Sequence, residues 1–259
     1  MNNSFLNLSL PWMAVAIFSV TYLVTGSIYL VVRRLAVNER AKDFKAFSPG
    51  MLPPLGILFA LLVGFIAVEV WGNFDKAKAA VATEASALRA VILLAGAFPE
   101  DRKRIYPLIN SHINEAVNKE WPAMAQQKMT LAALPTALIE ALHDTLELKP
   151  ADDSQRAAQS EMVKELHSAL DARRQRIVIS ESALGTVKWL AILLQGFCTL
   201  IAIALVHSDN RVASIISLTL FATGVALSVL LIAAYSRPFT SIGPELLKQV
   251  TTSEVPFGG

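Results

Sequence analysis

Hydrophobic residues along this 259-residue chain gather in four stretches that are almost free of charge. Each stretch is close to the roughly 20 residues that an α-helix needs to cross the hydrocarbon core of a bilayer. None alternates apolar and polar positions as a membrane strand does, and a helix satisfies its own backbone hydrogen bonds in lipid. We therefore predict four transmembrane helices, within residues 11–32, 51–70, 189–206 and 212–235.

The polar stretch between the second and third spans, residues 72–188, has a helical pattern of its own. Apolar residues recur every three or four positions across residues 74–95, and no proline separates them from the second span. The pattern predicts one helix over about residues 54–95, roughly 60 Å long at about 1.5 Å per residue. This helix leaves the bilayer and enters solvent, and Gly96 and Pro99 end it.

Shorter periodic stretches predict three more helices in this insert. The first ends near Trp121 and the second stops before Pro150. The third follows three N-cap candidates, Asp152, Asp153 and Ser154, and runs toward the third span. The chain after the fourth span is rich in proline and glycine, and we expect it to be mostly loop.

The predicted fold is an all-α integral membrane protein with a helical extramembrane insert between the second and third transmembrane helices. Composition agrees, because 54% of the residues are apolar and 17% are charged, whereas soluble domains have about 45–50% and about 25%. The predicted parts are 1–71 (transmembrane helices one and two), 72–188 (the insert), 189–236 (transmembrane helices three and four) and 237–259 (a tail).

Charge and potential ligands exclude several classes of function. A net charge of +2 offers no basic footprint for nucleic acid. The single cysteine, Cys198, excludes an internal disulfide and any multi-cysteine metal site. There is no glycine-rich phosphate loop and no nucleophile elbow, so we expect no enzymatic activity and no cofactor or metal. The histidines are scattered and have no partner at ligand spacing: His112, His143, His167 and His207.

The second span has two distinct faces. Small residues spaced by four let another helix approach closely: Gly56, Ala60 and Gly64. Beside them is a stripe predicted to line a pore: Ile57, Leu61, Phe65 and Glu69. Two interpretations of Glu69 stay open. Its carboxylate either extends to the lipid headgroups, or it forms an acidic ring beyond an apolar constriction around a symmetry axis.

The short loops bear on orientation in the membrane. By the positive-inside rule, they place the insert outside the cytoplasm. Basic residues at the flanks of the insert, such as Lys76 and Lys188, count the other way. The basic residues of the short loops are Arg33, Arg34, Arg40, Lys42, Lys45 and Arg211 on one side, against Arg237 and Lys248 on the other.

Several segments resemble a bacterial membrane family related to the bestrophin channels, over roughly residues 52–244. They are Val70-Trp71-Gly72-Asn73-Phe74, Glu84-Ala85, Glu120-Trp121-Pro122-Ala123-Met124-Ala125 and Arg237-Pro238-Phe239. The resemblance implies a pentameric, mostly anion-conducting channel whose second helix carries an apolar neck. Ile57, Leu61 and Phe65 fall on the neck positions. It also implies a cytoplasmic insert in a bacterial inner membrane, and we favour that orientation over the one from loop charges.

Two departures from the bestrophin pattern limit what the resemblance implies. Phe74-Asp75 stands where bestrophins have a doubled tryptophan. Thr240-Ser-Ile-Gly-Pro stands where they have an acidic calcium clasp, so calcium gating is not implied. Glu69 also leaves the preference for anions open.

Two functions are therefore compared. The first is a homo-oligomeric ion channel in the cell membrane, whose partners are lipid, further copies of itself and small permeating ions. The second is a non-conducting, membrane-anchored helical scaffold or sensor that binds a partner through its insert.

Overall fold

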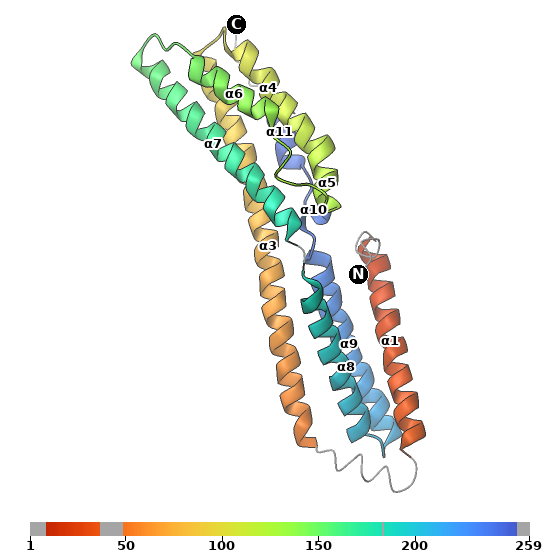
Figure 1. Cartoon of the computed structure of the whole chain (residues 1–259). Coiled ribbons are helices and arrows are strands. Elements are labelled where there is room, and N and C mark those ends of the chain that lie inside the picture. The colour runs from red at the N-terminus through yellow and green to blue at the C-terminus, as the bar shows by residue number, and fades with distance from the viewer. Residues whose placement is uncertain (1–8, 37–48, 183, 253–259) are drawn as a thin grey trace. The chain divides into compact units, whose positions relative to one another are not determined.

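The computed structural model describes residues 9–36, 49–182 and 184–252 (Figure 1). Its contacts divide the chain into two compact units, which we describe separately. The membrane unit comprises Met1–Gly72 and Leu184–Ser236. The polar unit comprises Asn73–Ala183 and Arg237–Gly259. In the described residues every regular element is a helix, which confirms the predicted fold class.

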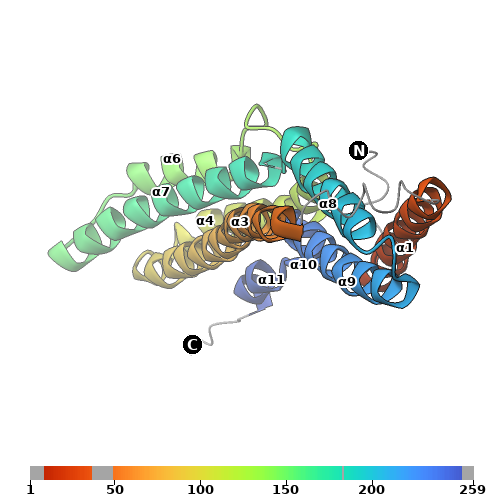
Figure 2. The same ribbon diagram turned by 90° about the horizontal axis from the view of Figure 1, so that it is seen from below.

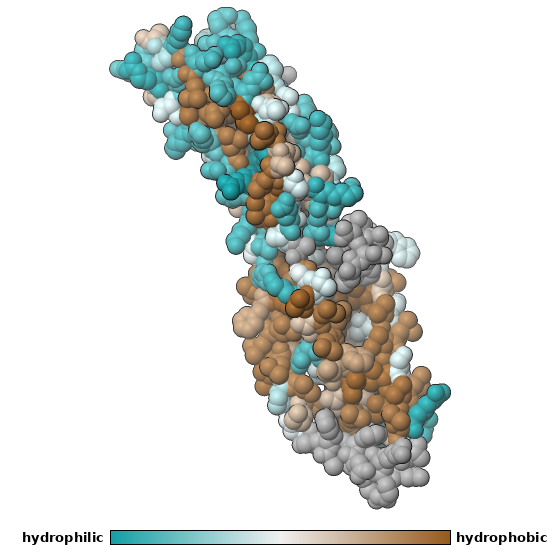
Figure 3. Space-filling model, viewed as in Figure 1, coloured by the Kyte–Doolittle hydropathy of each residue, from teal (hydrophilic) through white to brown (hydrophobic). Residues whose placement is uncertain are grey.

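Four helices are long and apolar enough to cross a membrane, in the four predicted places. Three belong wholly to the membrane unit: α1 (Leu10–Leu35), α8 (Thr186–Val206) and α9 (Arg211–Tyr235). The fourth is α3 (Leu52–Leu94), which a short 3₁₀ turn, η2 (Pro49–Met51), precedes. Apolar residues cover the visible surface of the membrane unit, whereas hydrophilic residues dominate that of the polar unit (Figure 3).

Within the membrane unit, α1 lies beside α9 in both ribbon views (Figures 1 and 2). A hydrogen bond of 2.9 Å joins the Tyr22 and Thr223 hydroxyls of these two helices. On α8, Gly196 faces the Phe59 ring of α3 and the Val225 side chain of α9, and a Cβ added there would lie 3.4 Å and 3.5 Å from them, an ordinary van der Waals distance. Lipid supplies no hydrophobic force between helices, so van der Waals contacts and hydrogen bonds of this kind hold the membrane unit together.

Helix α3 is continuous over 43 residues, which corresponds to about 65 Å. Its first part belongs to the membrane unit and the rest to the polar unit. This confirms that the second span runs on into the insert without a reversal. A 3₁₀ turn, η3 (Ala95–Ala97), ends the helix where Gly96 was expected to end it.

The polar unit contains the three predicted helices. They are α4 (Arg102–Glu115), α6 (Thr136–Glu147) and α7 (Asp153–Glu181). Asp152 caps α7, because its Oδ1 accepts a hydrogen bond of 2.7 Å from the Gln155 backbone N–H.

The end predicted for α4 differs from the observed one. A π-helical turn, η4 (Ala116–Glu120), and a short helix, α5 (Trp121–Ala125), continue beyond α4. Pro122 does not stop them because it stands in the first turn of α5, where a missing N–H is tolerated.

The prediction of a mostly unstructured tail was wrong for its described part. Two short helices form, α10 (Pro238–Ser241) and α11 (Glu245–Thr252). Phe239, Leu247 and Val250 are buried in the core of the polar unit. Pro238 begins α10 rather than preventing it, and the apolar spacing from Leu247 to Val250 gives α11 one buried face.

Some predictions fall outside the described residues. Arg40, Lys42 and Lys45 lie in residues 37–48, and they are half of the basic residues on which the loop-charge orientation rests. Pro256 of the tail lies outside as well.

Candidate functional site

The predicted pore-lining residues lie on an exposed face of α3. Side chains spaced by four residues share a helix face, and here Ile57 is 60% exposed, Leu61 52% and Phe65 73%. None of the three belongs to a core cluster of the membrane unit. In a single chain this face is open to lipid, to an axis or to another subunit.

The small-residue face of α3 is also open. No atom lies within 4 Å of a Cβ placed on Gly56 or Gly64, and Ala60 is exposed. The described helices of the same chain therefore do not use this face for close packing. A packing role for it stays a prediction that concerns a second chain.

Glu69 has a specific partner that the sequence analysis missed. The Lys188 ammonium, in the first turn of α8, donates a hydrogen bond to the Glu69 carboxylate. Each side chain is a little under half exposed. Neither open interpretation of Glu69 included this pair. The charge of Glu69 is therefore compensated by a cation of the same chain.

A second cluster of charged residues is buried in the polar unit, and we call it the ion cluster. Arg176 is at its centre. Its Nη2 donates to Glu84 Oε1 at 2.9 Å and to Glu120 Oε2 at 3.1 Å, while its Nε donates to Glu84 Oε2. Neither Arg176 nor Glu84 has any exposed surface. The residues of the ion cluster are Glu84, His112, Glu120, Arg173 and Arg176.

The remaining contacts complete the pairing of the buried charges. His112 Nε2 hydrogen-bonds Glu84 Oε1 at 3.0 Å. Arg173 donates from Nε to Glu120 Oε1 at 2.7 Å and from Nη2 to the Ala133 carbonyl at 2.8 Å. Two guanidinium groups thus meet two carboxylates, so each of these four charges in the ion cluster has a counterion. The pairing connects α3, α4, η4 and α7 within the polar unit.

Two opposing effects act on Arg176. Burial alone would lower the pKa of its guanidinium, because a low-dielectric interior disfavours a charge. The carboxylates of Glu84 and Glu120 outweigh this effect and raise the pKa above its ordinary value. Arg176 is therefore a permanent cation within the fold, and the two acids depend on it for compensation.

A signal for the ion cluster was present in the sequence. Glu84 lies between Val81 and Leu88 on the apolar side of α3, and Arg173 precedes Ile177 on the apolar side of α7. A charged residue at an apolar position of a periodic helix is either a break in the pattern or a buried, paired charge. The sequence analysis treated the four histidines as scattered. It therefore missed His112, which the fold places within hydrogen-bonding distance of Glu84.

Among the residues that the structure describes, no three or more histidine, cysteine or acidic side chains are placed to hold a metal ion. The cations of the ion cluster are arginines, which are not metal ligands in proteins. Its carboxylates are engaged by guanidinium groups instead. The chemistry of the cluster is that of structural ion pairing.

Motifs that are distant in the sequence meet beside the ion cluster. The Trp121 ring packs edge-on against Phe239, with 5.5 Å between centroids, and its Nε1 donates to the Ile242 carbonyl at 3.0 Å. The guanidinium of Arg176 lies over the same ring, 5.3 Å from its centroid. Pro238 is also buried. Three segments that carry the family resemblance therefore meet in the polar unit: Glu84, Glu120-Trp121-Pro122 and Pro238-Phe239.

Comparisons with known proteins agree with the fold. Two crystal structures of point variants of a bacterial bestrophin homologue from Klebsiella pneumoniae are similar, with TM-scores of 0.65 and 0.66 at 15% and 16% identity. The similarity covers 92% of this chain and 96% and 97% of theirs. A crystal structure of a point variant of a membrane protein has a TM-score of 0.67 at 15% identity, over 92% of this chain and 95% of that one.

At such low identity these structures establish the fold alone. No protein with a curated function matches the sequence. The profile of the bestrophin-like domain, however, matches residues 19–242, which is most of the chain. The protein therefore belongs to the bestrophin-like family.

Proposed function

We propose that the protein is a homo-oligomeric ion channel of bestrophin-like type, whose pore is lined by the first part of α3. The open apolar face of α3 carries this proposal. Of the four candidate spans, α3 is the least buried within its own chain, at 17% of its most apolar window against 22%, 33% and 44% for the others. A helix with few contacts in its own subunit is available to face an axis that several subunits share.

Around such an axis, each residue of the α3 stripe becomes a ring. Ile57, Leu61 and Phe65 give three successive apolar rings, about 6 Å apart along the helix at about 1.5 Å per residue. Narrow apolar rings exclude water, and ions cannot pass without it. The stripe is thus a hydrophobic gate, and a widening of the rings opens it.

The charges beyond the gate are balanced in each subunit. One Glu69 and one Lys188 per subunit form a ring of ion pairs rather than a purely acidic ring. Such a ring exerts only a weak net field on passing ions, because opposite charges at short distance cancel. Selectivity therefore depends on how far each member of the pair reaches into the path.

We further propose a closed ring of five subunits, by analogy with bestrophins. Native mass spectrometry in detergent checks this number. Monomers at micromolar concentration would count heavily against a channel, because a single chain has four candidate spans, and four helices are too few to enclose a pore.

Ion flux from liposomes that contain the purified protein tests the function. We expect flux above that of empty liposomes, and an increase when Ile57, Leu61 and Phe65 are all replaced by alanine, because apolar bulk leaves the narrowest point. A matched control replaces Val212, Ile216 and Leu220, an equally spaced and exposed stripe on α9.

The possible outcomes separate the hypotheses. No flux above background favours the non-conducting scaffold. A lower melting temperature with unaltered unitary conductance in the α3 variant places the stripe in helix packing and ends the gate assignment. An equal rise in flux for the α9 variant points to a general disturbance of the membrane unit.

We also propose that the polar unit lies on the cytoplasmic side. Ser154→Cys, at the start of α7, should react with an impermeant thiol reagent only after cell lysis. Ser48→Cys, which lies between the first two spans in the sequence, should react in whole cells. The unaltered protein controls for Cys198. Labelling of Ser154→Cys without lysis would show that the loop charges give the correct orientation.

A further inference from the structure

We propose that the membrane unit binds a phosphate group in a pocket between α1, α8 and α9. The pocket has a volume of about 520 Å³ and lies at the end of α1 and at the turn from α8 to α9. Its ligand is either the phosphodiester of an anionic lipid headgroup or a free phosphate ion. This inference does not rest on the channel proposal, because no residue of α3 lines the pocket.

Unpaired cations carry the inference. Arg33 and Arg211 both line the pocket. Across residues 9–36, 49–182 and 184–252, neither makes an ion pair or a side-chain hydrogen bond. One acid, Asp209, also lines the pocket, so two permanent cations face one anion. A guanidinium group offers a planar fork of donors that matches two phosphate oxygens.

Further polar groups of the pocket suit an oxyanion. The Ser208 hydroxyl is buried and has no hydrogen-bond partner, and a buried hydroxyl of this kind calls for an acceptor. Arg211 is the first residue of α9, a helix of 25 residues, so the positive end of the helix dipole adjoins the pocket. His207 also lines it, with Nδ1 held by the Ile203 carbonyl at 2.9 Å.

The position of the pocket explains why a lipid is one source of the phosphate. Val32 and Ala204 line it and also belong to an apolar core cluster of the membrane unit. The polar residues come from the ends of apolar helices, the level at which lipid phosphates lie. The cationic residues of the pocket suit a phosphate group, and its apolar residues suit the glycerol backbone of a lipid. A free phosphate ion would use the cationic residues alone.

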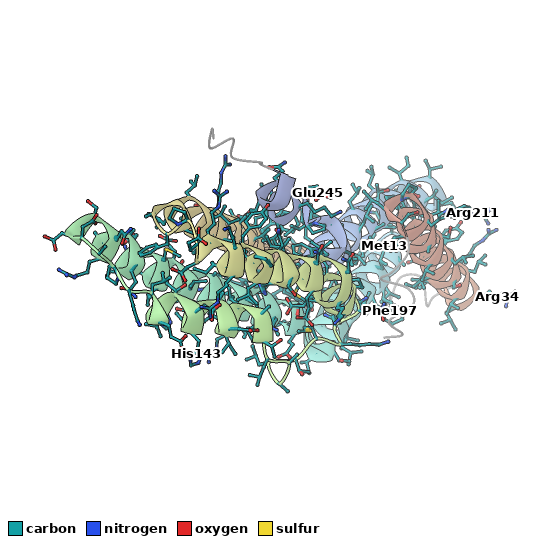
Figure 4. All side chains as sticks on the ribbon, turned by 90° about the horizontal axis from the view of Figure 1, so that it is seen from above. Met13, Arg34, His143, Phe197, Arg211 and Glu245 are labelled. Atoms are coloured by element: carbon teal, nitrogen blue, oxygen red, sulfur yellow. The ribbon has the colours of Figure 1, made fainter. Side chains whose placement is uncertain are left out.

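The test compares three soluble probes on the purified full-length protein in neutral detergent. They are short-chain phosphatidylglycerol, short-chain phosphatidylcholine and inorganic phosphate, with binding followed by native mass spectrometry and by the shift in melting temperature. The main variant is Arg33→Gln with Arg211→Gln. The matched control is Arg34→Gln, the neighbour of Arg33 on α1, which does not line the pocket. Figure 4 labels Arg34 on α1 and Arg211 on α9.

We expect the double variant to bind phosphatidylglycerol at least tenfold more weakly than the wild type, a loss of about 1.4 kcal/mol. Arg34→Gln should bind like the wild type, and phosphatidylcholine should bind weakly to all three proteins. Ser208→Ala provides a second variant that keeps every charge, and it should weaken binding severalfold. Melting temperatures without probe establish that each variant is folded.

Each outcome decides a point. Binding of phosphatidylglycerol but not of inorganic phosphate identifies a lipid headgroup site. Binding of both, with the same dependence on Arg33 and Arg211, identifies a site for free phosphate. Equal binding by the wild type and the folded double variant overturns the proposal. An equal loss in Arg34→Gln also overturns it, because the effect is then one of general surface charge.

Discussion

Helix α3 experiences opposite surroundings in the two units. In the membrane unit, Ile57 and Phe65 are exposed apolar side chains. In the polar unit, Leu88 and Val91 are buried, and so is the charged Glu84. In water, burial of apolar surface drives packing, and a buried acid is tolerated only with a counterion. In lipid an exposed apolar side chain carries no penalty, so exposure there marks a surface that is free for other contacts.

The largest effect should come from breaking the ion cluster. Arg176→Met leaves Glu84 and Glu120 buried without their shared cation, which costs about 3–5 kcal/mol of folding free energy. We expect a large fall in melting temperature in detergent. Arg174→Met, on the exposed side of the same helix, removes the same charge and should change little. An equal fall in both variants would mean that overall charge, not buried pairing, stabilises the polar unit.

Two phenylalanines of α3 test the membrane unit in the same way. Phe59 is 7% exposed and its ring lies 5.5 Å from that of Phe221, whereas Phe65 is 73% exposed. Phe59→Ala should destabilise the protein by about 3 kcal/mol through the cavity that it leaves. Phe65→Ala should leave the melting temperature almost unchanged. A comparable loss for Phe65→Ala would show that its face packs against another helix and does not line a path.

A smaller effect is expected where the tail joins the polar unit. Trp121→Phe keeps an aromatic ring against Phe239 but removes the hydrogen bond to the Ile242 carbonyl, which should cost about 1 kcal/mol. Trp12→Phe is the control, because Trp12 is 67% exposed. Thermal melting of the two variants measures the difference. If Trp121→Phe melts like the wild type, the α10 contact contributes little to the polar unit.

The smallest effect on stability, but an informative one on conduction, concerns Glu69 and Lys188. An exposed ion pair is worth at most about 1 kcal/mol, so both single variants should fold normally. In a salt gradient, Glu69→Gln should shift the reversal potential toward anion preference and Lys188→Gln toward cation preference. The double variant should return close to the wild-type value. Shifts of the same sign would show that the pair is not at the permeation path.

Local patterns accounted for much of the fold. Charge-free length identified the four spans, periodicity identified the continuous α3, and Asp152 was correctly expected among the caps of α7. These signals lie within one helix or its first turn. The wrong expectation for the tail has a related cause, because α11 depends on burying Leu247 against the rest of the polar unit.

Contacts between distant residues were not predicted. Glu84 and Arg176 are 92 residues apart and Glu69 and Lys188 are 119 apart, so no window of periodicity contains both members of either pair. Trp189 illustrates the same limit. It stands at the end of a predicted span, a position typical of an interfacial anchor, yet it is 6% exposed and packs in a core of the membrane unit. The pore-lining assignment itself stays a prediction.

The continuity of α3 also restricts how the chain can change in length. Each residue added to a helix turns everything beyond it by about 100°. One residue inserted between Gly72 and Ala77 would turn the part of α3 that carries Glu84 by this angle relative to the part that carries Ile57. Seven residues come within about 20° of two full turns and nearly restore the phase. Along α3, insertions in steps of about seven residues therefore keep the angular order of its side chains, whereas single insertions do not.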